Sequence, residues 1–179
     1  MALGSGTHKV GPAEGSLHVY SYRDGMAQKV GHDLIIDVQK WEGIVEVDGD
    51  QPAQLTLDAD GGSLRVREGV GGAKPLGDKD HKKIHDGIDD DILRKQPIAF
   101  RSTLVSHANG GLTIGGDLTL VGTTRPASFD LALSDDGRLR GKVTVTQSEW
   151  GIKPYKALMG ALKVRDEIEI AIDVALPTS

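Results

Sequence analysis

The sequence contains no cysteine, few aromatic residues and no excess of basic charge, and each absence excludes a class of function. Without cysteine the chain has no disulfide bond, no thiolate nucleophile and no cysteine-ligated zinc. The two Trp, two Phe and three Tyr residues are scattered and offer no stacking platform for nucleic-acid bases. Lys and Arg number 21 against 26 Asp and Glu, whereas phosphate-backbone binding needs clustered basic side chains. We therefore expect no nucleic-acid partner.

Long apolar runs are also missing from the chain. No window approaches the ~18 apolar residues of a membrane span, and residues 1–10 lack the apolar stretch of about 7 to 15 residues that marks a secretory signal. These features predict a cytoplasmic protein without stable membrane insertion. The length of 179 residues lies below the roughly 250 at which a core usually divides, so we expect one domain over residues 1–179.

Alternation of apolar and polar residues is the dominant pattern in the sequence, and it is typical of half-buried antiparallel strands. Turn-forming residues separate the alternating segments, notably Asn109-Gly110-Gly111 and Asp135-Asp136-Gly137. The alternation predicts about ten strands, over residues 17–23, 34–41, 45–47, 55–59, 64–66, 98–104, 112–120, 129–133, 139–145 and 168–174.

Helices are the minority element. Ile84, Ile88 and Ile92 recur at every fourth position, and Pro97 follows, which predicts one helix over about residues 78–95. A second short helix is expected over residues 155–162. One helix cannot cover the apolar faces of ten strands, so the strands must cover one another, as a sandwich or as a barrel. The predicted fold class is all-β and antiparallel.

The inward faces of these strands consist of Leu, Ile, Val, Phe and Ala. A buried charge without a partner is costly, so a ligand enclosed by these faces would be mostly hydrocarbon. The same pattern is also compatible with a dry interior filled by its own side chains. Periodicity specifies the lining and leaves both interpretations open.

Two histidines suggest a different class of function. His81 and His85 share one face of the predicted helix, with Asp78 and Asp89 nearby, an arrangement compatible with a divalent metal and a metal-dependent enzyme. The ordinary alternative is that both histidines pack at the edge of the core beside Ile84.

Three segments make the sequence resemble the YceI-like family: Ile98-Ala-Phe-Arg-Ser-Thr103, Gly116-Asp-Leu-Thr-Leu-Val-Gly-Thr-Thr-Arg-Pro126 and Ser148-Glu-Trp-Gly-Ile-Lys-Pro154. The likeness spans roughly residues 16–175. It implies a closed, lipocalin-like antiparallel β-barrel with an inserted helix, holding a long apolar molecule such as a polyisoprenoid or a fatty-acid derivative. Related barrels often pair, so the resemblance is compatible with a homodimer.

Together, the residues and the resemblance favour a non-enzymatic protein, without cofactor, that sequesters or carries a lipophilic small molecule. A solid-core interaction module and the metal-dependent enzyme are the alternatives. Trp41, Trp150 and Tyr155 are candidates for the mouth of the barrel, where amphipathic rings suit a boundary. The candidate lining residues are Leu34, Ile36, Val38, Val45, Leu57, Phe100, Leu104, Ile114, Leu118, Phe129, Leu131, Val143 and Ile170.

Overall fold

The computed structural model describes residues 2–178 and contains a strand at each of the ten predicted positions. Three further strands, β1, β12 and β13, lie outside those predictions, and the end of the predicted strand 17–23 belongs to a separate short strand, β3. The strands are β1 (Gly6–Val10), β2 (Gly15–Ser21), β3 (Arg23–Asp24), β4 (Asp33–Val38), β5 (Trp41–Asp48), β6 (Gln51–Ala59), β7 (Leu64–Val70), β8 (Ile98–Ala108), β9 (Gly111–Leu120), β10 (Thr123–Leu133), β11 (Arg138–Thr146), β12 (Lys156–Ala157), β13 (Leu162–Val164) and β14 (Glu167–Ala175).

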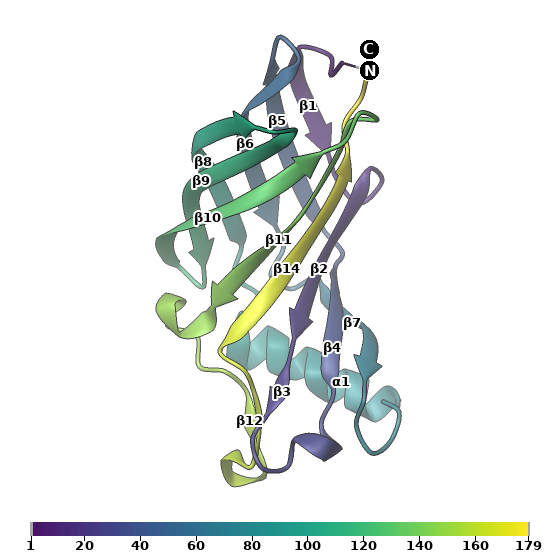
Figure 1. The fold of residues 1–179 in the computed structure, drawn as a ribbon. Coiled ribbons are helices and arrows are strands. Elements are labelled where there is room, and N and C mark those ends of the chain that lie inside the picture. The colour runs from purple at the N-terminus through teal and green to yellow at the C-terminus, as the bar shows by residue number, and fades with distance from the viewer. Residues whose placement is uncertain (1, 179) are drawn as a thin grey trace.

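Eleven strands form one antiparallel sheet in the order β1-β5-β6-β8-β9-β10-β11-β14-β2-β4-β7. The sheet curls around its apolar face (Figure 1). Within residues 2–178 its edge strands β1 and β7 do not pair with each other, so the expectation of a closed barrel is wrong.

One long, bent hairpin explains why the sheet stays open: β4 and β5 form one arm, and β6 and β7 form the other. Only Gln39 and Lys40 separate β4 from β5, and these two strands pair with β7 and β6 respectively. Two hydrogen bonds continue the ladder through the bend: the Gln39 N–H donates to Ser63 O at 3.1 Å, and the Asp60 N–H donates to Lys40 O at 2.9 Å. Strands β5 and β4 therefore lie next to the edge strands β1 and β7 at the two ends of the sheet order, and the continuous chain through Gln39 and Lys40 joins these ends in place of a lateral strand pair.

The predicted turn at Asn109 is confirmed, and its backbone explains the sequence there. Asn109 and Gly110 join β8 to β9 with φ angles of 51° and 74°. Positive φ at both central residues is the requirement of a type I′ hairpin turn, which favours Asn-Gly.

The predicted helix is confirmed, but it ends before residue 95. It consists of α1 (Asp78–Gly87) and a π-helical turn, η2 (Ile88–Ile92), in which the Leu93 N–H donates to Ile88 O at 2.8 Å. Arg94 and Lys95 have φ angles of 52° and 54°, and this left-handed backbone cannot continue a right-handed helix. Ile84, Ile88 and Ile92 pack against the apolar core.

The second predicted helix, over residues 155–162, is wrong. This segment forms β12, a 3₁₀ turn η4 (Leu158–Gly160) and β13, because Leu158 and Met159 have φ angles of 50° and 56°. Strands β12, β13 and β3 make a small second sheet at the lower end of Figure 1, beside a 3₁₀ turn η1 (Gln28–Val30). Within residues 2–178, no helix is long and apolar enough to cross a bilayer.

Strands β10 and β11 part soon after their shared turn. They pair only at Ala132 with Arg140 and at Leu133 with Leu139, whereas β10 pairs with β9, and β11 with β14, along most of their lengths. Figure 1 shows the two strands diverging. We call this divergence of β10 and β11 the fork. Beyond the two residue pairs, no ladder hydrogen bonds join the two strands.

Candidate functional site: an apolar cavity

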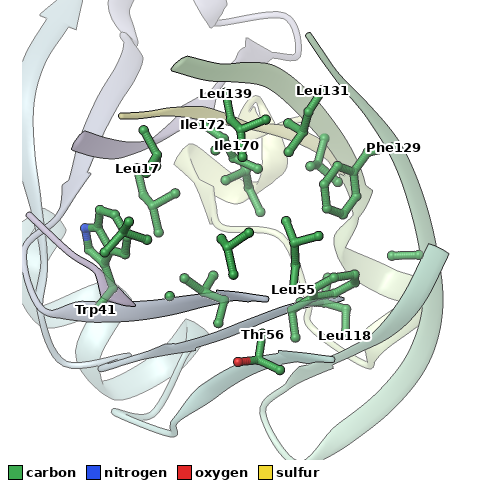
Figure 2. Close-up of a pocket in the computed structure, with 18 residues that line it drawn as sticks. Leu17, Trp41, Leu55, Thr56, Leu118, Phe129, Leu131, Leu139, Ile170 and Ile172 are labelled. Atoms are coloured by element: carbon green, nitrogen blue, oxygen red, sulfur yellow. The ribbon is translucent and has the colours of Figure 1, made fainter. Parts of the chain in front are cut away.

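The inner face of the curled sheet encloses a cavity of about 110 Å³. Nine strands contribute side chains, which point toward one hollow in Figure 2. The lining residues are Val10, Leu17, Trp41, Gly43, Val45, Leu55, Thr56, Leu57, Phe100, Leu118, Ala127, Phe129, Leu131, Leu139, Val143, Ile170, Ile172 and Val174.

The chemistry of this lining is almost purely aliphatic and aromatic. Within the described residues, no charged side chain borders the cavity, and the polar side-chain atoms are limited to the Thr56 hydroxyl and the Trp41 indole N–H. The rings of Phe100 and Phe129 pack against each other with centroids 5.3 Å apart. Such a lining can bury hydrocarbon, and it provides no acid, base or nucleophile for a chemical step.

The sequence pattern predicted about half of the residues that surround this cavity. Of the predicted residues, the structure places Trp41, Val45, Leu57, Phe100, Leu118, Phe129, Leu131, Val143 and Ile170 on its wall. Leu34, Ile36, Val38 and Ile114 belong to the same apolar core but do not line the cavity. The first three lie on β4, which contributes no residue to the wall.

Leu104 does not face the interior, and a β-bulge is the reason. The pairing of β8 with β9 shifts between Ser102 and Leu104, and one extra residue in a strand reverses which side chains face inward. Leu104 is consequently 59% exposed, while Val105 packs against the core instead. The predicted alternation was correct up to Phe100 and wrong beyond the bulge.

The two remaining predicted aromatic residues lie away from the cavity. Trp150 is only 4% exposed, and its indole N–H donates to Leu118 O at 2.9 Å. It ends the 3₁₀ turn η3 (Gln147–Trp150), which follows β11, and so fastens that turn to β9, at the opposite end of β11 from its pairs with β10. Tyr155 precedes β12 and is 39% exposed. Neither residue forms a rim around the cavity, and Trp41 belongs to its wall.

Several lining residues were missed for two different reasons. Leu55, Leu139, Ile172 and Val174 continue the alternating inward faces, so the period-two signal could have included them. Val10 and Gly43 carry no comparable signal. They meet because Gly43 has no side chain: a Cβ there would lie 2.9 Å from Val10 Cγ2.

The histidine pair does not assemble a metal site in this structure. The Val66 N–H donates to His85 Nε2 at 3.1 Å, which occupies that nitrogen and fixes the neutral imidazole as an acceptor. His81 meets His85 edge to face, with ring centroids 6.1 Å apart. Within residues 2–178, no group of three His, Asp or Glu side chains is placed to hold a metal ion. His85 instead links α1 to the edge strand β7.

This link predicts a pH dependence of stability. Burial lowers the pKa of His85 from its ordinary value, and the charge of Arg65 and the neighbouring His81 add to that effect, against Asp89 and Asp86. The unfolded chain therefore binds the proton at higher pH than the folded chain does. The stability that His85 provides should be complete above its unfolded pKa of about 6.5 and should decline as the pH falls below that value.

The measurement is urea unfolding at several pH values between about 7.5 and about 5.5, a range that spans the unfolded histidine pKa. The free energy of unfolding of wild type, relative to His85→Gln, should decrease as the pH is lowered, while a control variant at the exposed His107 of β8, His107→Gln, should follow wild type. Equal pH dependence in wild type and His85→Gln would contradict the link.

A second contact between titratable side chains joins Tyr22 to Glu169 of β14. The Tyr22 O–H donates to Glu169 Oε1, and this bond, with burial and the carboxylate charge, raises the pKa of Tyr22 to about 12. The phenol therefore stays protonated at neutral pH and offers no base. Tyr22 and Glu169 do not line the cavity.

Comparisons with known proteins agree with this fold. The family model of the YceI-like domain matches residues 25–176. The crystal structure of BcnA from Burkholderia cenocepacia superposes with a TM-score of 0.68 at 16% identity, covering 92% of this chain and 98% of that one. The YCEI protein of Campylobacter jejuni superposes at 0.53 with 14% identity, covering 80% and 85%. No curated protein matches the sequence. At these identities the structural likeness establishes the fold alone.

Proposed function

We propose, from the premise that the chain belongs to the YceI-like family, that it binds a lipophilic small molecule of polyisoprenoid or fatty-acid type. The observation that supports this most strongly is the cavity itself: it lies inside the sheet and no charged side chain borders it among the described residues. Hydrocarbon removed from water gains about 0.8 kcal/mol per methylene. A charged or strongly polar group would find no partner on this wall.

The size of the cavity limits what it holds without rearrangement. About 110 Å³ is smaller than the roughly 300 to 1,000 Å³ of pockets that enclose drug-sized ligands. If one methylene takes about 30 Å³, a water's share of liquid volume, the cavity holds about four methylenes. These would contribute about 3 kcal/mol, which is too little for tight binding. A longer chain therefore requires the interior to widen.

The fork between β10 and β11 is where we propose this widening occurs. Ala127 and Phe129 line the cavity from the part of β10 that does not pair with β11, and Val143 lines it from β11. Separating these side chains breaks no ladder hydrogen bond between the two strands. Elsewhere around the cavity, for example between β9 and β10, widening would break paired backbone groups, each worth about 0.5 to 1.5 kcal/mol net.

We propose binding rather than catalysis for the same site. The wall supplies no titratable side chain within the described residues, and His85, the candidate for metal-dependent chemistry, accepts a hydrogen bond from the backbone of β7. The role that fits is sequestration or carriage of the ligand.

Two measurements on the purified wild-type protein test this proposal. Native mass spectrometry before and after organic extraction should show a lipophilic adduct that extraction removes, and the extracted protein should take up a fluorescent isoprenoid analogue. Excess unlabelled geranylgeraniol should displace that analogue. Absence of both an extractable adduct and uptake would contradict the proposal and favour a solid-core interaction module.

A further inference from the structure

The turns η1 and η4 stand at the lower end of the molecule in Figure 1 and form a tip that carries exposed apolar side chains. We define the tip as Met26, Val30, Leu158 and Met159, which lie in and beside the 3₁₀ turns η1 and η4. Met26 is 97% exposed, Met159 is fully exposed, and Leu158 and Val30 are more than half exposed. Scattered single apolar residues are normal on a protein surface, but a cluster usually marks an interaction site.

Backbone contacts hold the two parts of the tip together. The Ala27 N–H, next to Met26, donates to Ala161 O at 2.7 Å. Strands β3 and β13 pair alongside, with Lys163 opposite Asp24. The two turns therefore form one unit, although more than a hundred residues separate them in the sequence.

The backbone of η4 presents its apolar side chains to solvent at a cost. Leu158 and Met159 both have left-handed φ angles, 50° and 56°, a conformation that disfavours non-glycine residues. This strained backbone directs two large apolar side chains into solvent, where they contribute nothing to the core. Strained positions of this kind cluster at functional sites.

The two chain segments that form the tip are rich in basic residues, although the protein as a whole is acidic. The chain carries a net charge of −5, yet residues 22–31 and 151–166 together contain six basic and two acidic residues. Lys29, Lys153 and Lys156 are exposed, and among residues 2–178 none of the three has an ion-pair partner. The helix α1, whose first turn is acidic, lies above the lower end of the molecule in Figure 1.

We propose that this tip docks reversibly on the surface of an anionic phospholipid bilayer, with its four apolar side chains in the interface and the lysines against the headgroups. Apolar residues within a basic surround match the two components of interfacial binding. A symmetric contact between two copies of the chain would bring the unpaired lysines of both tips together, so charge repulsion disfavours a second copy as the partner. Membrane docking of the tip does not depend on the cavity being occupied. If docking fails, the proposed binding of a lipophilic molecule in the cavity is unaffected.

Vesicle flotation tests the proposal with the full chain. Wild type should float with phosphatidylcholine vesicles that contain about 30% phosphatidylglycerol, should bind pure phosphatidylcholine vesicles much less, and should be released by high salt. Leu158→Asn/Met159→Asn should weaken partitioning about tenfold, and Asn tolerates the left-handed backbone, so the fold should persist. Lys29→Glu/Lys156→Glu should weaken partitioning by at least as much.

Matched controls separate the tip from general effects. Leu104→Asn changes an exposed leucine on β8, and Lys40→Glu/Arg125→Glu alters net charge as much as the lysine pair does, at two exposed positions away from the tip; both should bind like wild type. Failure of wild type to bind anionic vesicles, or equal losses in tip and control variants, would overturn the proposal. A wild-type dimer in light scattering that Leu158→Asn/Met159→Asn converts to a monomer would overturn it in favour of a contact between copies.

Discussion

Trp150→Ala should destabilise the protein by about 3 to 5 kcal/mol, the range for truncating a buried aromatic side chain. The indole of Trp150 is 4% exposed and donates to Leu118 O, so it fastens the turn that follows β11 to β9, at the opposite end of β11 from its two residue pairs with β10. Urea unfolding followed by circular dichroism measures the loss.

Trp150→Phe is the matched control for the hydrogen bond. It keeps most of the apolar packing and removes the donor to Leu118 O, so we expect a smaller loss of about 1 to 3 kcal/mol. A change within about 0.5 kcal/mol for Trp150→Ala, the range of ordinary surface substitutions, would show that the indole does not stabilise the attachment of η3 to β9.

Ala127→Leu should weaken ligand binding by at least about tenfold, equivalent to about 1.4 kcal/mol. Ala127 lines the cavity on the unpaired part of β10, so a larger side chain there occupies space that the ligand would use. The same change fills an existing cavity and should raise the free energy of unfolding by about 0.5 to 2 kcal/mol.

Ala132→Leu makes the same chemical change on the exposed face of β10 and should leave uptake of the fluorescent isoprenoid analogue unchanged. Opposite changes in binding and stability for Ala127→Leu exclude misfolding as the cause. Wild-type affinity in Ala127→Leu would place the ligand outside this cavity.

Strand positions could be predicted from the sequence because alternation records directly which side chains are buried. The segments 112–120 and 168–174 alternate without interruption, and each forms a strand. The three isoleucines of the segment 78–92 record the buried face of the helix in the same way. The turn at Asn109-Gly110 follows from the local backbone that these residues favour.

Features that depend on pairing between distant segments could not be predicted in this way. The bulge that exposes Leu104 is a relation between β8 and β9, and nothing in the local alternation marks it. The left-handed backbone at Leu158 and Met159, which replaces the predicted second helix, depends on the contact between Ala27 and Ala161 and on the pairing of β13 with β3.

The open edges of the sheet have a similar origin. Residues 34–47 read as consecutive strand segments, and local alternation does not reveal that β4 and β5 form one bent arm whose two halves lie next to opposite edge strands of the sheet. The resemblance to the YceI-like family supplied the expectation of closure, and the pairing of β4 with β7 and of β5 with β6 corrects it.

The most direct measurement is a methyl NMR titration of isotope-labelled protein with geranylgeraniol. Saturable shifts should appear at the methyl groups of Leu57, Leu131 and Ile170, which face the hollow, while those of the outward-facing Leu104 stay unchanged. Nuclear Overhauser contacts should join the ligand's hydrocarbon chain to the same methyl groups. Shifts confined to surface methyl groups, or an interior unchanged at saturating ligand, would contradict the account.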